Sequence, residues 1–170
     1  MPQDKKIYKG RIVFRGDIIK DESGYLAVFS EQGTSASRLE AAKYMDAIAR
    51  GSIDDTEICD GEEADAIGAY TQADLGGPPT WITIPRRYWP KEWIQKGYKN
   101  PVVRLIKNLY GHPLAGLYWE RHCNSALTSI GFEKVKGWEC LYVHRKDKLF
   151  LSVYVDDFKL AGRKASLKPM

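Results

Sequence analysis

The sequence predicts an α+β domain in which an antiparallel sheet packs against helices. β-rich runs separated by turn residues recur in the second half of the chain, and two other segments have the apolar spacing of helices. Of the 170 residues, 44% are hydrophobic, which is enough for one domain with a core. Disorder over most of the chain is therefore not expected.

The first part of the chain is expected to contain one strand and one helix. Residues 7–15 alternate well enough for a basic strand, and a stretch rich in Gly, Ser and Asp follows. A helix is expected to begin near Ser37, which would form a capping box with Glu40, and to end at Gly51. The acidic run of residues 54–63 is interpreted as a solvated loop.

A short strand is expected over residues 81–84, after a break made by glycines and prolines. Residues 85–101 are interpreted as an irregular basic connection. Trp89 and Trp93 within it could stack on nucleic-acid bases, but the pattern favours side chains that pin the connection to the core.

A second helix is expected over residues 113–131, because proline suits a first helical position and glycine a stop. Its apolar stripe consists of Leu114, Leu117, Tyr118, Leu127 and Ile130. This stripe is expected to belong to the core. The Lys- and Ser-rich tail of residues 163–170 is expected to be frayed.

The most informative segment is residues 149–161, Leu-Phe-Leu-Ser-Val-Tyr-Val-Asp-Asp-Phe-Lys-Leu-Ala. Its first part should pair as a hairpin with residues 138–144, and Asp156 and Asp157 read as a tight two-residue turn before a returning strand. Adjacent carboxylates repel each other unless a cation or hydrogen-bond donors compensate them, and Mg²⁺ is the natural partner of oxygen ligands. On these residues alone, a solvated surface turn is an equally good interpretation.

Further motifs favour the metal-binding interpretation through a resemblance. Residues 154–157, Tyr-Val-Asp-Asp, resemble the YxDD motif of reverse transcriptases. Four more motifs occur in the order found in the copia-type retrotransposon branch of that family. Residues 8–16 resemble its first basic strand, and residues 64–70 resemble the segment that carries its first catalytic aspartate. Residues 81–85 resemble a short strand that ends in proline, and residues 109–116 with Trp119 resemble its LYG block. Together these motifs are far more specific than any one alone.

The resemblance covers about residues 7–162 and implies a reverse-transcriptase-like fold of fingers and palm, with an antiparallel palm sheet and packed helices. The chain stops soon after the YVDD hairpin. Residues 1–170 are therefore expected to form a partial reverse transcriptase domain that lacks the thumb and the ribonuclease H domain.

The resemblance also implies a catalytic site. Asp65, Asp156 and Asp157 would be its catalytic and metal-binding residues, with two Mg²⁺ or Mn²⁺ ions as cofactors. Asp65 and Asp156 would bridge both ions, and the backbone carbonyl of Ala66 would bind the ion on the nucleotide side. Asp157 would support the ion on the primer side.

Nucleotide binding is assigned in the same way. Lys9 and Arg11 would hold the triphosphate, although Arg15 is an alternative because short basic strands align loosely. Tyr70 resembles the aromatic residue that excludes ribonucleotides, and its alternative is a buried core tyrosine. Tyr154 would contact nucleic acid.

One departure from the family pattern stands out. The chain has His112-Pro113-Leu114 where the copia pattern usually has Leu-Lys-Gln. The glutamine that would help to position template and nucleotide is therefore missing, which affects the expected efficiency or fidelity.

Charge is unevenly distributed. The net charge is +2 over residues 1–50, −8 over 51–85 and +10 over 86–170. The basic parts could neutralise backbone phosphates, although many soluble domains of similar pI bind no nucleic acid. The expected partners are an RNA or DNA template with primer, deoxynucleoside triphosphates and the remaining polyprotein domains.

A zinc site formed by cysteine and histidine residues is a weaker alternative interpretation. Three cysteines without a C-x-x-C pair indicate free thiols in a reducing compartment, and the spacing of the Cys and His residues matches no zinc finger. No signal peptide or long apolar run occurs, so we expect an intracellular protein, cytoplasmic or nuclear, without a membrane partner.

The function expected is that of a copia-like RNA-directed DNA polymerase fragment that transfers nucleotides to a primer 3′-hydroxyl. Weak or absent activity is expected of the chain alone, because the thumb normally grips the duplex. One alternative is a non-catalytic nucleic-acid-binding or assembly remnant of a transposon polyprotein. The other is an unrelated metal-binding α+β domain.

Overall fold

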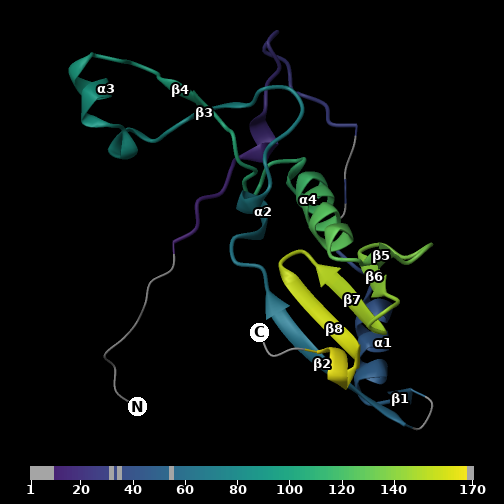
Figure 1. The fold of residues 1–170 in the computed structure, drawn as a ribbon. Helices are drawn as coiled ribbons and strands as arrows, with labels where there is room; N and C mark the ends of the chain where they lie inside the picture. Colours follow the sequence, from purple (N-terminus) through teal and green to yellow (C-terminus); the bar gives the residue numbers. More distant parts are fainter. Residues whose placement is uncertain (1–9, 31–32, 34–35, 54–55, 168–170) are drawn as a thin grey trace, which may run out of the picture.

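A six-stranded antiparallel sheet organises the chain (Figure 1). In the computed structural model, which describes residues 10–30, 33, 36–53 and 56–167, the strands follow the order β1-β2-β8-β7-β6-β5. Their bounds are β1 Ser52–Ile53, β2 Glu57–Asp65, β5 Glu133–Lys134, β6 Leu141–His144, β7 Leu149–Tyr154 and β8 Asp157–Arg163. The expected α+β class with an antiparallel sheet is therefore confirmed.

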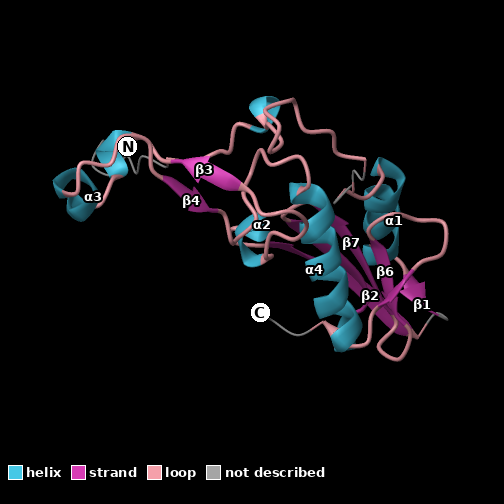
Figure 2. Cartoon of the chain, turned by 90° about the horizontal axis from the view of Figure 1, so that it is seen from above, coloured by secondary structure: helices cyan, strands magenta, loops and turns pink. Residues whose placement is uncertain are grey.

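Two helices cover opposite faces of this sheet, α1 (Leu39–Ala49) on one and α4 (Ala115–Ser129) on the other (Figure 2). The strand β7 shows why, since its successive side chains point to alternate faces. Leu149, Leu151 and Val153 pack with α4, whereas Phe150 packs with α1. A continuous apolar run is thus buried on both sides, as expected of a central strand.

The helix α1 begins differently from the expected capping box. Its first residue is Leu39, and no side chain caps its N-terminus. The hydroxyl of Ser37 lies 2.7 Å from the hydroxyl of Ser152 on β7, and the Ser37 N–H donates to the carbonyl of Val153. The capping prediction was wrong because the sheet, not the helix, takes up the polar groups of Ser37.

The acidic run predicted to be a loop is largely the strand β2. It pairs with β8 from Cys59 opposite Arg163 to Asp65 opposite Asp157. Cations from the β6–β7 turn and from β8 offset its charge: Glu57 lies 2.9 Å from Lys148, and Glu63 lies 3.2 Å from Lys159. Asp54 and Asp55 lie outside the described residues. The loop prediction was wrong because the compensating charges are distant in sequence.

The central hairpins agree with the sequence prediction, with one shift. β6 pairs with β7, and β7 with β8, as expected. The turn between β7 and β8 consists of Val155 and Asp156, however, and Tyr154 pairs with Asp157. The turn was predicted one residue too late, because the local pattern does not fix the register of the two strands.

The helix α4 lies where the periodicity predicted it, but of the predicted stripe only Leu127 is fully buried. Its buried residues are Ala115, Trp119, Cys123 and Leu127. These positions recur every fourth residue and therefore lie on one side of the helix. Ile130, which was expected in the core, is 64% exposed just beyond the last turn.

The N-terminal segment departs from the expected strand. Residues 10–15 have no strand geometry, and the part of the prediction on residues 7–9 lies outside the described residues. The Phe14 N–H donates to the carbonyl of Tyr110 at 2.7 Å before a short helix η1 (Gly16–Ile18). This single backbone hydrogen bond joins residues far apart in sequence, but it does not amount to the repeated pairing of a β-strand.

A second, two-stranded sheet projects from the body of the molecule (Figures 1 and 2). It pairs β3 (Trp81–Thr83), which was expected, with β4 (Val102–Arg104), which was not. The connection holds η2 (Arg86–Tyr88) and α3 (Lys91–Gln95). The indole of Trp89 donates to the carbonyl of Ile84 at 2.6 Å, so it pins the connection to the end of β3.

The C-terminal part was predicted to be frayed from residue 163 on. Arg163 instead ends β8, η3 (Lys164–Ser166) follows, and Leu167 packs against the core on the α4 side. That prediction was wrong as far as Leu167, and residues 168–170 lie outside the described part. In the described residues, no helix has the length and apolar character needed to cross a membrane.

Candidate active site

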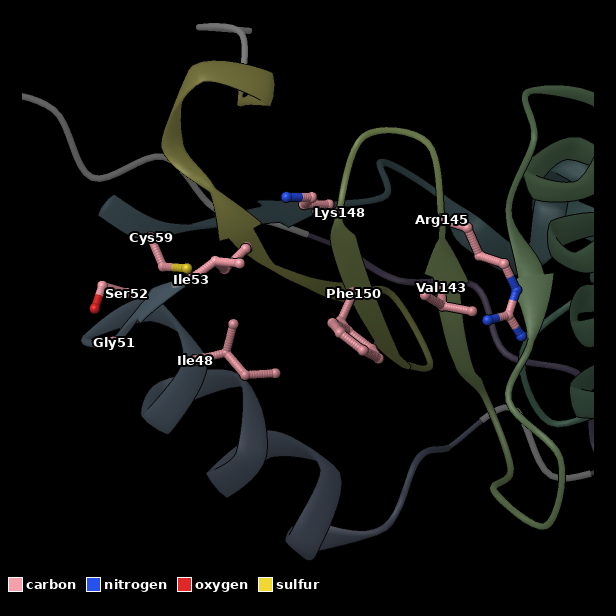
Figure 3. Close-up of a pocket in the computed structure, with 10 residues that line it drawn as sticks. Ile48, Gly51, Ser52, Ile53, Cys59, Val143, Arg145, Lys148 and Phe150 are labelled. Atoms are coloured by element: carbon pink, nitrogen blue, oxygen red, sulfur yellow. The ribbon is translucent and has the colours of Figure 1, made fainter. Parts of the chain in front are cut away.

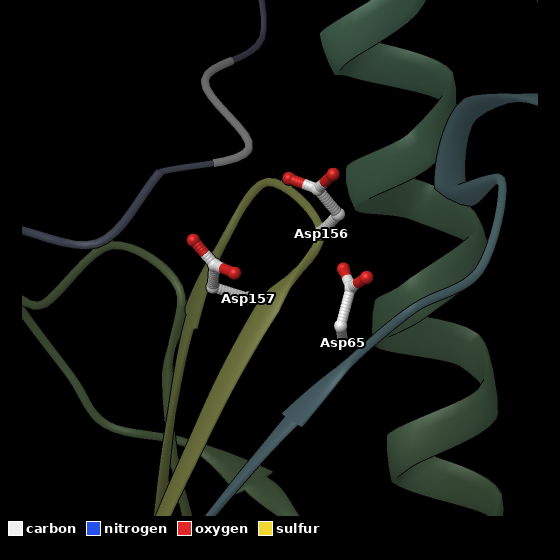
Figure 4. A group of neighbouring side chains, drawn as sticks. All are labelled: Asp65, Asp156 and Asp157. Atoms are coloured by element: carbon white, nitrogen blue, oxygen red, sulfur yellow. The ribbon is translucent and has the colours of Figure 1, made fainter. Parts of the chain in front are cut away.

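Three carboxylates meet at one end of the large sheet (Figure 4). Asp65 ends β2, Asp156 lies in the turn that follows β7, and Asp157 begins β8. One ligand atom from each lies within 4.8 Å of the others. The structure thus brings together the three residues that the sequence predicted to be catalytic, although Asp65 is far from the other two in the chain.

The register of β2 against β8 explains this meeting. It sets Asp65 directly opposite Asp157, and the N–H of Ala66 donates to the carbonyl of Asp156 at 2.7 Å. The end of β2 is therefore fixed to both the strand and the turn that carry the other carboxylates.

The turn itself has an unusual backbone. Val155 has a φ of 57°, which is an outlier for a β-branched residue and costs about 1–3 kcal/mol. Its carbonyl accepts a 2.5 Å hydrogen bond from the indole of Trp119 on α4. A strained turn persists only where its surroundings hold it, and here the bonds from Trp119 and Ala66 do so.

The three carboxylates have no cationic partner in the described part of the chain. The nearby Lys159 is engaged elsewhere, by Asp46 at 2.6 Å and Glu63 at 3.2 Å. Asp65 and Asp157 are exposed and Asp156 is half-buried. Like charges this close repel, and hard divalent cations prefer oxygen ligands. The donor set therefore fits Mg²⁺ or Mn²⁺.

The backbone carbonyl of Ala66, predicted to be a metal ligand, already has one partner. It accepts a hydrogen bond from Ala69 at the start of α2 (Ala69–Gln72), with 3.1 Å between the nitrogen and the oxygen. A carbonyl oxygen has two lone pairs, so one remains available for a cation.

Two of the residues predicted to bind nucleotide, Arg11 and Tyr70, contact Tyr110, to which the sequence analysis assigned no role. The ring of Tyr110 lies 4.5 Å from that of Tyr70, and the guanidinium of Arg11 lies 5.0 Å from its centre. Burial raises the pKa of the Tyr110 hydroxyl, and the Asp156 carboxylate raises it further. Tyr110 thus connects Arg11 and Tyr70 with the carboxylates. The LYG block, which contains Tyr110, was the one feature of the sequence that could have indicated this position.

The structure gives less information on the other residues that were predicted to bind nucleotide or nucleic acid. Lys9 lies outside the described residues. The alternative Arg15 forms an exposed ion pair of 3.0 Å with Asp17. Tyr154 is 56% exposed beside the carboxylates, so a nucleic-acid contact there stays a prediction.

The departure at residue 112 has a packing role in this chain. His112 is 5% exposed, and its ring centre lies 5.2 Å from that of Phe14 and 5.9 Å from that of Phe29. Its Nδ1 accepts a hydrogen bond from the N–H of Leu114, and burial lowers its pKa. A neutral His112 therefore joins the N-terminal segment to the start of α4.

The zinc interpretation finds no support in the part of the chain that the structure describes. The one group of three or more potential ligands there is the aspartate group. Cys59, Cys123 and Cys140 are buried thiols that form no disulfide, as the odd cysteine count predicted. Burial raises the pKa of Cys123 to about 11 and that of Cys140 to about 12, so both stay protonated at neutral pH.

Two concave regions lie on the α1 side of the sheet. One, of about 750 Å³, is lined by Asp65, Asp157 and Tyr154 and by the start of α1. The other, of about 450 Å³, lies at the far end of the sheet and is mainly apolar (Figure 3). Its cations Arg145 and Lys148 are paired with glutamates. The first pocket is therefore the one that adjoins the carboxylates.

Fold and site together define a class: an α+β domain with a three-carboxylate site suited to divalent cations. Comparison with known proteins makes this more specific. A family model described as reverse transcriptase (RNA-dependent DNA polymerase) matches residues 2–168. The chain belongs to this family, in its copia-type retrotransposon branch. The alternative of an unrelated metal-binding domain is thereby excluded.

Curated relatives agree with this assignment. The Ty1-DR4 and TyH3 transposon Gag-Pol polyproteins of Saccharomyces cerevisiae are each 28% identical over 94 residues, which is 55% of this chain. The truncated Ty1-A Gag-Pol polyprotein of the same yeast matches equally well. The matched part is 6%, 5% and 8% of these relatives, so the chain resembles a small portion of each. No solved structure matches the chain.

Proposed function

We propose that this chain is the fingers–palm portion of a copia-like RNA-directed DNA polymerase, with its active site at Asp65, Asp156 and Asp157. The single observation that carries the proposal is the meeting of these carboxylates at the tip of the β7–β8 hairpin. Membership of the reverse transcriptase family supports it, because residues 154–157 have the Tyr-x-Asp-Asp pattern of that family.

The carboxylates would hold two Mg²⁺ or Mn²⁺ ions. Such ions, when bound, activate the attacking primer hydroxyl and stabilise the leaving pyrophosphate. Asp65, Asp156 and Asp157 would hold these ions, with the free lone pair of the Ala66 carbonyl as a further ligand on the nucleotide side and Asp157 on the primer side. The bonds from Ala66 and Trp119 to the turn would keep Asp156 oriented toward Asp65.

Arg11, Tyr110 and Tyr70 would form the nucleotide side of the site. The guanidinium of Arg11 suits a triphosphate, and Lys9 would add a second cation. Tyr70 would lie beneath the incoming sugar and collide with a 2′-hydroxyl, which selects deoxynucleotides. The ring of Tyr110 would keep Tyr70 in place, because the two rings are in contact.

The partners would be a template with its primer, deoxynucleoside triphosphates and the other domains of a polyprotein. The chain resembles only a small part of its polyprotein relatives. Contacts to the phosphate backbone supply much of the affinity for nucleic acid. We therefore propose that the isolated chain has weak or no activity and acts within a longer protein.

The test is incorporation of deoxynucleotides on an RNA template with a DNA primer, in Mg²⁺ or Mn²⁺. Wild type is compared with Asp156→Asn and with Glu139→Gln, which removes an exposed carboxylate away from the site. Incorporation lost in Asp156→Asn alone supports the proposal. Measurable incorporation that Asp156→Asn retains at the wild-type level contradicts it.

A second candidate is a folded, non-catalytic remnant that binds nucleic acid or takes part in assembly. The burial of His112 between Phe14 and Phe29 favours it, because a packing residue stands where the family usually has part of its template- and nucleotide-positioning segment. This candidate predicts that Asp156→Asn leaves nucleic-acid affinity unchanged and that neither protein incorporates nucleotides.

A further inference from the structure

The apolar concave region at the end of the large sheet that carries the β6–β7 turn lies away from the three carboxylates. We name it the far groove. Its volume is about 450 Å³, and its apolar lining consists of Ile48, Ile53, Cys59, Val143 and Phe150 (Figure 3). Sites for small molecules have volumes of about 300–1,000 Å³ and are lined mainly by apolar side chains. The far groove has the size and the lining of such a site.

The far groove is elongated and crosses the sheet. Its lining comes from the end of α1 and from β1, β2, β8, β7 and β6, which are neighbours in this order. Neighbouring strands lie about 4.8 Å apart, so the five strands span roughly 19 Å. An extended chain follows a groove of this shape, whereas a compact ring leaves much of it unfilled.

Most apolar side chains of the lining keep part of their surface uncovered. Ile48, Ile53, Val143 and Phe150 are half-buried, whereas Cys59 is 6% exposed. The fully buried core on the α1 side consists of other residues, namely Ala41, Met45, Leu141 and Ala161. A ligand that covers the half-buried side chains removes apolar surface from water, which is favourable.

Positive charge gathers at one edge of the far groove. Arg145 and Lys148 lie there at the β6–β7 turn, and among the described residues none that lines the groove is acidic. Glu57 pairs with both Lys148 and Arg163, so one carboxylate offsets two cations. Arg145 donates to Glu133 through Nε at 3.1 Å, and its Nη nitrogens form no hydrogen bond within the described part of the chain. An anionic group at this edge therefore meets hydrogen-bond donors and uncompensated positive charge.

We propose that the far groove binds a long-chain carboxylate. The alkyl chain lies along the groove toward Ile53, and the carboxylate contacts Arg145 and Lys148. The opposite orientation is unfavourable, because α1 ends beside Ile48 and the C-terminus of a helix carries a partial negative charge. The proposal concerns a surface separate from the three aspartates and does not rest on the proposed function.

Other occupants match these observations less well. A small polar anion would contact the cations but leave the apolar lining uncovered. A side chain of a partner protein would fill only part of a groove that crosses five strands. A long chain with one terminal acid matches both the shape of the groove and the position of its charge.

The experiment titrates the protein with cis-parinarate, a carboxylate whose chain becomes fluorescent where water is excluded, below its micellar concentration. Wild type should bind this probe saturably. Dodecanoate should displace the probe at least fivefold more effectively than dodecanol, because the alcohol has no charge to pair with the cations. Absence of saturable binding, or equal displacement by the acid and the alcohol, would overturn the proposal.

The charged edge is tested by Arg145→Gln with Lys148→Gln. This variant should lose at least fivefold in affinity for dodecanoate and retain its affinity for dodecanol. Lys136→Gln with Lys146→Gln removes the same charge from exposed positions that do not line the groove, and it should bind as wild type does. Equal losses in the two variants would refute the assigned position of the carboxylate.

The location of the alkyl chain is tested by Ser52→Trp. Ser52 is exposed on β1 and lines the groove, so an indole there takes the place of the chain and should weaken cis-parinarate binding at least tenfold. Ser23→Trp adds the same ring at an exposed serine outside the groove and should bind as wild type does. Circular dichroism confirms that each variant is folded. Unchanged binding by a folded Ser52→Trp variant would place the ligand elsewhere.

Alkylation of Cys59 by iodoacetamide, located by peptide mass spectrometry, reports on the same site in wild type. Cys59 lines the groove (Figure 3), whereas Cys123 is buried on the α4 side and serves as the internal control. Dodecanoate should slow the reaction at Cys59 at least threefold more than at Cys123. Equal protection of both thiols would reflect general stabilisation and contradict binding in the groove. Protection of Cys59 by a peptide of alternating leucine and glutamate, with none by dodecanoate, would assign the groove to a partner protein instead.

Discussion

The indole Nε1 of Trp119 donates a 2.5 Å hydrogen bond to the carbonyl oxygen of Val155. Trp119 is buried in the first half of α4, and Val155 precedes Asp156 in the turn between β7 and β8. One bond thus connects the helix that covers the sheet with the strained turn that presents a carboxylate. We expect the position of Asp156 to depend on this contact.

Replacing Trp119 with phenylalanine keeps a buried ring but removes the donor. The carbonyl of Val155 then loses its partner, so the free energy of unfolding should fall by about 1–2 kcal/mol in urea unfolding followed by circular dichroism. Trp138→Phe, which also replaces an indole but packs on the α1 side, is the control. A Trp119→Phe change no larger than that of the control would contradict the importance of the bond.

The positive φ of Val155 predicts an unusual tolerance to glycine. Val155→Gly relieves a strain of about 1–3 kcal/mol, which offsets the flexibility that glycine adds to the unfolded chain. Its stability should stay within about 1 kcal/mol of wild type. Val153→Gly, two residues earlier and buried in the core, should cost more than about 2 kcal/mol. Equal losses at the two positions would show that the turn is not strained.

The hydroxyl pair between Ser37 and Ser152 predicts non-additive substitutions. Both side chains are buried, and their oxygens lie 2.7 Å apart. Ser152→Ala alone leaves the Ser37 hydroxyl without a partner, at a cost of about 1–3 kcal/mol. Adding Ser37→Ala should recover part of this loss, because no buried hydroxyl remains. Thermal or urea unfolding of the four proteins in this cycle checks the coupling, and strict additivity would argue against it.

The buried thiols predict a loss of stability at alkaline pH. Burial raises the pKa of Cys123 to about 11 and that of Cys140 to about 12, whereas a thiol in the unfolded chain titrates near pH ~8.5. Above that pH the unfolded state releases protons that the folded state retains, so unfolding becomes more favourable as the pH rises toward 11. Urea midpoints should fall between pH 8 and pH 10, less steeply in Cys123→Ala. An unchanged slope in that variant would refute the assignment.

Much of the fold could be predicted from local patterns. The run of residues 149–155 and the periodicity of residues 113–131 predicted β7 and α4, because apolar spacing depends on the residues themselves. β2 could not be predicted in this way. Its acidic residues are tolerated because Lys148 and Lys159, almost a hundred positions away, lie beside them.

Part of the candidate site could also be predicted from local patterns, and part could not. The sequence itself indicates that Asp156 and Asp157 are candidate site residues, because a carboxylate pair interrupts an apolar strand. Asp65 was found through the resemblance alone. The roles of Trp119 and Tyr110 depend on contacts made across the fold, with Val155 in one case and with Arg11 and Tyr70 in the other. No local sequence pattern predicts such contacts.

The central claim is that Asp65, Asp156 and Asp157 together hold divalent cations. Binding of Mn²⁺, measured from the electron paramagnetic resonance signal of the free ion, tests it without requiring polymerase activity. We expect wild type and Glu139→Gln to bind Mn²⁺, and Asp65→Asn and Asp156→Asn each to lose at least tenfold in affinity. Equal Mn²⁺ binding by all four proteins, each shown to be folded, would contradict the claim.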